Sequence, residues 1–215
     1  MHLPDGLLPA PVCIAGFAVT GLTTWYSLKQ INRFSNPTES IPKASLLTAA
    51  FFVASSIHIP IPPASVHLIL NGLMGTLLGY YAFPAVLIGL FLQAVVFGHG
   101  GLTTLGVNAA MMGIPALLAY HLFGWSQRAT RHWSTNWSLG SSAFLAGAVG
   151  LGLAVLVFLT LTLSFLPAGL DANLERAAIL GLALAHIPLM LIEGAFTAIL
   201  VLFLNRVKPQ LLKQT

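Results

Sequence analysis

Long runs of apolar residues, separated by short polar connections, occupy this sequence from about residue 7 to residue 206. Of the 215 residues, 57% are hydrophobic and only 7% are charged. A soluble globular domain carries about a quarter charged residues, so this chain has too few polar side chains to cover itself in water. Apolar runs of this length are typical of helices that cross a lipid bilayer. We therefore predict an all-α integral membrane protein.

Seven apolar segments are candidates for the membrane-spanning helices. A hydrocarbon layer about 30 Å thick needs roughly 20 helical residues, and fewer where a helix is buried in the protein. The second, third and fourth segments are short, which indicates a compact bundle around a site near one membrane face. The first is too long for a signal peptide and lacks a basic leader, so we expect it to be retained. We expect one transmembrane domain over residues 1–215, with spans at about 7–31, 43–58, 66–80, 82–98, 103–125, 139–166 and 173–206.

The basic residues orient these spans. With seven crossings, eight of the nine Lys and Arg residues fall on one side of the membrane, and only Arg176 falls on the other. Membrane proteins carry an excess of Lys and Arg in their cytoplasmic loops. We therefore predict an outer N-terminus and a cytoplasmic C-terminus. The eight residues on the cytoplasmic side are Lys29, Arg33, Lys43, Arg128, Arg131, Arg206, Lys208 and Lys213.

Several classes of protein are excluded by what the sequence lacks. The basic residues lie between apolar segments and form no single patch, so we expect no nucleic-acid partner. Cys13 is the only cysteine, which rules out a disulfide framework or a CxxC metal site. The sequence contains no Walker A, HExxH or GxSxG pattern, so hydrolysis of ATP or peptides is not encoded here. We predict a protein that is not an enzyme, since no nucleophile–base pair is recognisable either.

The N-terminus begins Met1-His2 and offers an unusual set of nitrogen donors. The amine of Met1, the backbone amide of His2 and the His2 imidazole can form two fused chelate rings on one metal ion. A second imidazole would complete a square of four nitrogens, a geometry that suits Ni(II) or Cu(II) better than Zn(II) or Mg(II). Histidine is too bulky for routine removal of the preceding methionine, so we expect Met1 to remain. A histidine at position two is by itself a weak signal.

Other histidines fall at the same predicted outer face. His67 follows a proline-rich connection, and Ser65 is a plausible N-cap, which would place His67 in the first turn of a helix. The helix dipole disfavours imidazolium there and would keep the ring neutral and able to bind metal. The alternative is a histidine at the headgroup boundary with one hydrogen bond. His58 is interpreted as the end of the preceding helix, where it either supports a metal ligand or interacts with the free carbonyls of the helix end; the second interpretation is favoured.

Uncharged polar residues within the spans are costly unless they are hydrogen-bonded. Gln93 and Asn108 are expected either to hold a docked N-terminal segment or to join two helices. His99 lies in a glycine-rich turn that permits close approach of another backbone segment. Asp5 is expected to neutralise positive charge, to orient the His2 ring or to cap the first helix.

His186 and Glu193 lie on one face of the last predicted span, seven residues apart. Ionisable residues inside a membrane are candidates for function. A rise of about 10 Å separates them along the helix, so they do not contact each other directly. They support an alternative hypothesis, in which the protein is a self-sufficient metal-ion channel or secondary carrier that relays protons or ions through these two side chains.

Three motifs together resemble one protein family. They are the opening Met1-His2-Leu3-Pro4-Asp5-Gly6, the Pro-Ile-Pro-Pro run before Ser65-Val66-His67, and the segment from Gly100 to Asn108. The family is the nickel/cobalt substrate-binding membrane subunit (S-component, CbiM/NikM type) of energy-coupling factor (ECF) transporters, which are ABC importers. The resemblance extends over essentially the whole chain.

The resemblance implies that the N-terminal segment folds back into the bundle from outside. It implies Ni²⁺ or Co²⁺ as the transported substrate, bound by the Met1 amine, the His2 amide and ring nitrogens, and the His67 ring. The loop of His99 and the span of Asn108 would brace this site. Candidates to hydrogen-bond to the ligands are Asp5, Gln93, His99, Asn108 and His186.

The resemblance also implies partners. A transmembrane coupling (T) subunit and two cytoplasmic ATPases would supply the energy, and a small accessory membrane subunit accompanies many such systems. The whole assembly would lie in the cell membrane of a prokaryote, surrounded by lipid.

Overall fold

The computed structural model describes residues 2–61, 64–165 and 172–212. These residues form seven α-helices, a two-stranded hairpin and two short 3₁₀ turns. The helices are α1 (Ala10–Ile31), α2 (Ile41–Ala54), α3 (Asn71–Leu78), α4 (Ala82–Phe97), α5 (Leu105–Ala129), α6 (Thr135–Ser164) and α7 (Ala172–Val207). The strands are β1 (His58–Ile61) and β2 (Ala64–His67), and the 3₁₀ turns are η1 (Gly79–Tyr81) and η2 (Pro209–Leu212).

The predicted membrane bundle is confirmed in its general form. Five helical stretches within the described residues are long and apolar enough to cross a bilayer, and α2 is a shorter apolar helix. The stretch Asn71–Phe97 joins α3 and α4, which the sequence predicted as separate spans. Seven crossings and the sides on which the termini lie stay predictions. The five stretches are Ala10–Ile31, Asn71–Phe97, Leu105–Ala129, Thr135–Ser164 and Asn173–Val207.

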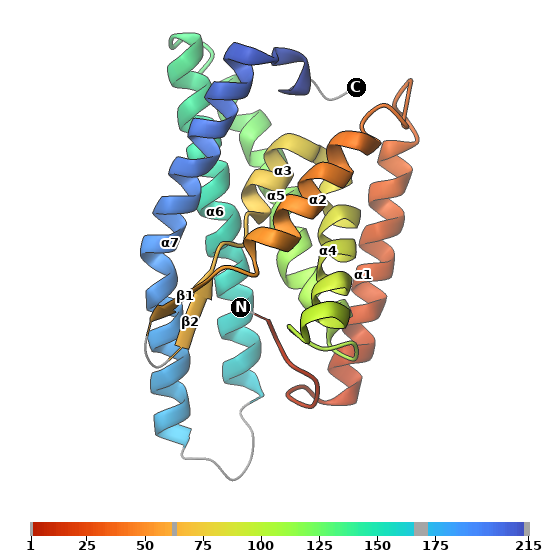
Figure 1. Ribbon diagram of the computed structural model, residues 1–215, viewed down its shortest axis with the longest axis vertical. Coiled ribbons are helices and arrows are strands. Elements are labelled where there is room, and N and C mark those ends of the chain that lie inside the picture. Colours follow the sequence, from red (N-terminus) through yellow and green to blue (C-terminus); the bar gives the residue numbers. More distant parts are fainter. Residues whose placement is uncertain (1, 62–63, 166–171, 213–215) are drawn as a thin grey trace.

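The long helices α6 and α7 run side by side at one edge of the bundle, and α1 lies at the opposite edge (Figure 1). The helix α5 lies between them and packs against α1, α3, α4 and α6. The 3₁₀ turn η2 lies at the same end as the α1–α2 connection (Figure 1), where the Lys43 Nζ donates to the carbonyl of Leu211 at 3.1 Å. This arrangement surrounds the short helix α3 with longer ones.

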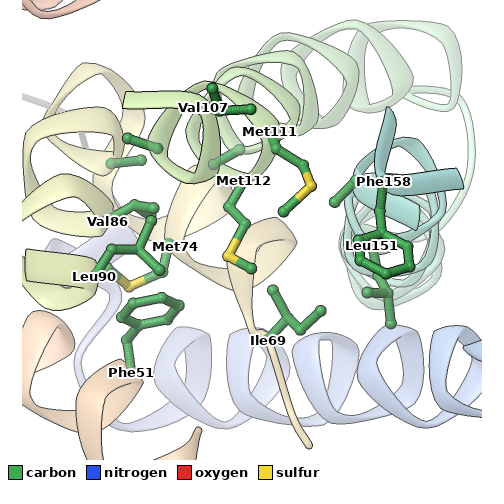
Figure 2. Close-up of a cluster of buried hydrophobic side chains, with 14 of the residues drawn as sticks. Phe51, Ile69, Met74, Val86, Leu90, Val107, Met111, Met112, Leu151 and Phe158 are labelled. Atoms are coloured by element: carbon green, nitrogen blue, oxygen red, sulfur yellow. The ribbon is translucent and has the colours of Figure 1, made fainter. Parts of the chain in front are cut away.

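Both the interior and the surface of the bundle are apolar. Side chains such as Phe51, Met112 and Leu151 meet in one cluster between the helices (Figure 2). Large apolar side chains also point outward, including Ile14 at 69% and Trp137 at 74% exposure. Helices that are apolar on all sides belong in a membrane, where lipid covers the outer face.

The helix α3 is packed unusually tightly, because two of its glycines touch neighbouring backbones. A Cβ atom at Gly72 would lie 2.5 Å from the carbonyl oxygen of Ala146 in α6. A Cβ atom at Gly75 would lie 1.9 Å from the carbonyl oxygen of Ala116 in α5. Small residues let membrane helices approach to backbone contact in this way. The start of α3 is therefore held against both neighbours.

The segment before α3 differs from the prediction. The sequence predicted helices over 43–58 and 66–80, but α2 ends at Ala54 and α3 begins only at Asn71. Between them β1 and β2 pair in antiparallel fashion, with His58 opposite His67. A residue that precedes proline is disfavoured in the helical region and adopts an extended backbone. Because prolines follow both Ile59 and Ile61, the chain extends here instead of continuing a helix.

Candidate metal centre

The N-terminal segment lies against the bundle and is bound by side chains near the start of α5. Leu3 is fully buried, and its amide donates to Asn108 Oδ1 at 2.9 Å. Asn108 Nδ2 donates back to the Leu3 carbonyl at 3.0 Å, and the Thr104 hydroxyl donates to the same carbonyl at 2.6 Å. The side-chain amide of Asn108 thus pairs with both the backbone N–H and the backbone carbonyl of Leu3, as a neighbouring β-strand would. The backbone that follows His2 is held in one position.

A chain of hydrogen bonds sets the orientation of the His2 ring. The His2 Nε2 lies 2.8 Å from Gln93 Oε1. Gln93 Nε2 donates to the Ser55 hydroxyl at 2.5 Å, which in turn donates to the carbonyl of Phe52 at 2.9 Å. Since a carbonyl oxygen only accepts, the direction of the whole chain is fixed, and the His2 Nε2 must carry its proton. The nitrogen left unprotonated is Nδ1, the one that can close a chelate ring with the His2 backbone amide.

The His67 ring lies beside the ring of His2. The two ring centroids are 5.1 Å apart, with an angle of 26° between the planes. His67 is 4% exposed, and its Nδ1 lies 3.1 Å from the Leu68 carbonyl oxygen. A carbonyl accepts only, so Nδ1 carries a proton, and in the neutral ring Nε2 is the unprotonated nitrogen. The two histidines therefore present one unprotonated ring nitrogen each.

Enclosure keeps the His2 ring neutral. Burial of the ring lowers the pKa of His2 well below its usual value, and the neighbouring ring of His67 lowers this pKa further. The residue retains some exposed surface. A neutral imidazole is the form that binds metal ions, so the surroundings of His2 favour that form.

The glycine-rich loop after α4 packs against the N-terminal segment. The His99 ring lies 6.2 Å from that of His2, centroid to centroid, with 28° between the planes. A Cβ atom at Gly100 would lie 3.5 Å from the His2 Cβ, and one at Gly101 would lie 2.0 Å from Asp5 Oδ1. The close approach predicted from these glycines is therefore present.

Asp5 binds this loop and neither of the groups predicted for it. Its carboxylate accepts from the amide and hydroxyl of Thr103, at 2.9 and 2.5 Å, and from the amide of Leu102 at 3.3 Å. These hydrogen bonds from Thr103 lower the pKa of Asp5. The helix α1 begins at Ala10 and has no side-chain cap, so the predicted capping role is wrong. The His2 ring donates its hydrogen bond to Gln93 and not to Asp5.

The predictions for His67 and His58 as helix-terminal residues are also wrong. His67 is the last residue of β2, four positions before α3 begins, and Ser65 lies inside the strand. His58 opens β1 and does not end a helix. A helix dipole does not act on His67 as the sequence predicted, since the proline-rich segment forms strands. The ring is instead buried and is held by the hydrogen bond between its Nδ1 and the Leu68 carbonyl.

His186 and Glu193 form their hydrogen bonds with backbone groups. His186 is buried in α7, and its Nδ1 bonds to the carbonyl of Leu182 in the same helix at 2.7 Å. Glu193 accepts from the backbone amides of Ile69 and Leu70. Met1, predicted to supply the terminal amine, lies outside the described residues. Ser55 and Thr104 were not predicted as residues of the site, because single hydroxyl residues in apolar segments carry no distinguishing pattern.

No cluster of three or more His, Cys, Asp or Glu side chains suited to a metal ion occurs in the part of the chain that the structure describes. A site built from two imidazoles and main-chain nitrogens does not need such a cluster. The described residues bring together two of its predicted parts, the rings of His2 and His67.

Comparison with known proteins places this geometry in context. The model of the family CbiM, described as cobalt uptake substrate-specific transmembrane region, matches residues 2–211. A Haemophilus influenzae protein named as a candidate metal transport protein is 34% identical, over 100% of this chain and 98% of its own length. The cobalt transport protein CbiM of Sorangium cellulosum is 30% identical, over 99% of this chain and 94% of its own length.

A nickel transport protein and a solved structure are also similar to this chain. The fused nickel transport protein NikMN of Rhodobacter capsulatus is 31% identical, over 99% of this chain and 64% of its own length. The crystal structure of a truncated transition metal transporter matches with a TM-score of 0.77 and 24% identity, over 96% of this chain and 99% of that chain. At this level of identity the likeness establishes the shared fold.

Proposed function

This chain belongs to the CbiM family, the cobalt uptake substrate-specific transmembrane region, and we propose that it captures Ni²⁺ or Co²⁺ for import. The resemblance read from its three sequence motifs is confirmed. Its relatives are named as transport proteins, which favours a transporter over an enzyme. The observation that carries the proposal is the hydrogen-bond chain from His2 through Gln93, which leaves His2 Nδ1 unprotonated beside His67.

We propose four nitrogen ligands for the substrate ion: the Met1 amine, the His2 backbone nitrogen, His2 Nδ1 and His67 Nε2. A metal–nitrogen bond of about 2.0 Å puts a ligating ring's centroid about 3 Å from the ion. In the proposed square the two rings occupy neighbouring positions, about 90° apart at the metal, so their centroids would lie roughly 4.5 Å apart. The 5.1 Å between the rings of His2 and His67 is within about 1 Å of this value.

Four nitrogens in a plane favour Ni(II) over Co(II), and Cu(II) would bind more tightly still. Selection against copper must then come from cavity shape or from metal availability. The docking of Leu3 onto Asn108 supports the planar arrangement, because it fixes the backbone on the C-terminal side of the chelating residue.

The energy for import would come from partners. We propose that the chain works with a transmembrane coupling (T) subunit and two cytoplasmic ATPases of the energy-coupling factor type, with or without a small accessory membrane subunit. The absence of an ATP-binding motif from the sequence supports this division of labour. In the proposed setting the N-terminus faces outward, the C-terminus faces the cytoplasm, and the protein lies in the cell membrane.

The alternative of a self-sufficient channel or carrier has less support. A relay through α7 would need His186 and Glu193 to exchange protons along a connected path. Instead, the His186 ring bonds to the carbonyl of its own helix, and the Glu193 carboxylate accepts from two backbone amides. Neither bond links the two side chains.

The decisive experiment compares two proteins by calorimetry with Ni²⁺ and Co²⁺. One has its native N-terminus, and the other carries four extra residues before Met1. A single extra residue would place the histidine third from the amine, where two backbone amides can join it in a new nickel chelate. The longer extension leaves every side chain in place and removes the terminal amine from the chelate. We expect tight binding by the native protein and a loss of at least 100-fold in the extended one. Equal affinities would show that the N-terminal chelate is not the site.

A further inference from the structure

Glu193 is buried inside the bundle, yet its carboxylate binds the backbone next to the candidate metal site. Glu193 is 1% exposed and lies on the inner face of α7. Its two oxygens accept from the amide of Ile69 at 2.5 Å and from the amide of Leu70 at 3.0 Å. These amides follow His67 by two and three positions. The side chain of Ile69 points into the apolar cluster near Met112 (Figure 2).

The turn that receives Glu193 has an unusual backbone. Leu70 has φ 56° and ψ 14° and is the only non-glycine residue with positive φ within the described residues. A bulky side chain rarely adopts this left-handed conformation. Two successive backbone amides that point toward one place form a binding site for an anion. The Glu193 carboxylate occupies this position and stabilises the turn between β2 and α3.

A second polar side chain holds the same turn from the other helices. Asn71 Nδ2 donates to the carbonyl of Gly150 in α6 at 3.0 Å and to that of Met112 in α5 at 3.4 Å. The Asn71 side-chain oxygen accepts from the amide of Gly72. The backbone just after His67 is therefore fastened to α5, α6 and α7. On its other side, β2 is paired with β1.

We infer that Glu193 is a positioning residue for the metal site, which it serves by holding the β2–α3 turn so that the His67 ring stays beside His2. This inference rests on the proposed function. Glu193 acts through the amides of Ile69 and Leu70, which its carboxylate binds. A carboxylate is suited to this role because it accepts with both oxygens and donates with neither.

The test replaces the carboxylate with an amide of the same shape, in Glu193→Gln. Glutamine has only one oxygen that can accept a hydrogen bond. Its side-chain NH₂ group would therefore face the backbone N–H of either Ile69 or Leu70, and two donors would meet. We expect the affinity for Ni²⁺ to fall by about tenfold or more, as for other residues that hold metal ligands in place. The absorption spectrum of the nickel-saturated protein should also change, because the His67 nitrogen no longer lies in its place. A fall in stability alone would leave that spectrum unchanged.

Two further variants separate positioning from general damage to the bundle. Thr197→Val alters the same buried face of α7 one turn later, where the hydroxyl donates to the carbonyl of Glu193. It should leave nickel affinity and spectrum unchanged. Leu70→Gly, added to Glu193→Gln, should restore most of the affinity, because glycine adopts positive φ without strain. A double variant as weak as Glu193→Gln would overturn the inference, as would full affinity in Glu193→Gln.

His67→Ala distinguishes this inference from the proposed function. If His67→Ala keeps native affinity, the proposed metal site is wrong. If His67→Ala loses affinity but Glu193→Gln does not, only the positioning role is wrong. Should Glu193→Gln fail to fold, Glu193→Asp takes its place, because the shorter carboxylate cannot reach both amides; unchanged affinity there overturns the inference. In the native protein, hydrogen exchange at Ile69 and Leu70 should be slow, and exchange as fast as in an exposed loop contradicts the role.

Discussion

The ring of His2 donates its Nε2 hydrogen to Gln93 Oε1 at 2.8 Å, across 91 positions of sequence. Gln93 is fully buried in α4, and its own amide group is oriented by Ser55 at the end of α2. The hydroxyl of Ser55 therefore determines, through Gln93, which nitrogen of His2 is unprotonated. A site that needs a neutral imidazole in one tautomer has that tautomer set by two uncharged residues.

The first prediction concerns Gln93→Leu. Leucine fills a similar volume but cannot accept the hydrogen of His2 Nε2, so the ring loses its fixed orientation. We expect a loss of about 10- to 100-fold in Ni²⁺ affinity, the range typical of partners that orient metal ligands. Ser55→Ala should give a smaller loss, because Gln93 remains and only its orientation is freed. Calorimetry with Ni²⁺ on both variants checks the prediction. A loss of affinity in Ser55→Ala that equals or exceeds the loss in Gln93→Leu would contradict it.

The second prediction concerns Asn108→Leu. This change leaves the amide and the carbonyl of Leu3 without the Asn108 side chain that now pairs with both. An unsatisfied buried polar group costs about 1–3 kcal/mol, so the N-terminal segment should detach more often. We expect faster hydrogen exchange in residues 2–9 and weaker Ni²⁺ binding. Exchange measured by mass spectrometry should change little in α6 and α7, and uniform change would indicate global destabilisation instead.

The third prediction uses the close packing of Gly101. A Cβ atom there would lie 2.0 Å from Asp5 Oδ1 and 2.6 Å from the Asp5 amide. Gly101→Ala should therefore displace the N-terminal segment and weaken Ni²⁺ binding by about tenfold or more. Gly21→Ala in α1 is the matched control, because a Cβ atom there meets nothing within 4 Å. The control should bind normally and gain up to about 1 kcal/mol of stability from helix propensity.

The fourth prediction concerns the pH dependence of the Asp5 contact. Hydrogen bonds from Thr103 lower the pKa of the Asp5 carboxyl in the folded protein. A lowered folded-state pKa adds stability above the unfolded-state value, and this contribution is lost as the pH falls through the folded-state pKa. We expect the native protein to unfold at a higher temperature than Asp5→Asn at pH 7. The two should converge in acid, below the usual aspartate pKa of about 3.9.

The control for Asp5 is Glu39→Gln, which removes an exposed carboxylate from the connection between α1 and α2. Thermal unfolding of that variant should follow the native protein at both pH values. A difference between the native protein and Asp5→Asn that persists unchanged in acid would show that the carboxylate charge is not the cause.

The sequence by itself determined the membrane environment of this protein and the approximate positions of most of its helices. Apolar runs and scarce charges require a membrane, and their lengths placed α1, α4 and α5 within a few residues of their observed bounds. These features are local, since each depends on residues that are neighbours along the chain. The prediction that His2 and His67 bind one metal ion also depended on local features, because it came from short motifs that resemble those of a protein family.

Tertiary structure decided which polar groups meet. Sequence reasoning gave Asp5 the choice of orienting His2 or capping a helix, but the fold brings Gln93 to the ring and Thr103 to Asp5. Likewise, no local pattern pairs Glu193 with Ile69, which precedes it by 124 positions. A hydrogen bond acts over about 3 Å, so its partner is set by how helices pack. That packing depends on backbone contacts such as Gly72 against α6, which no short stretch of sequence contains.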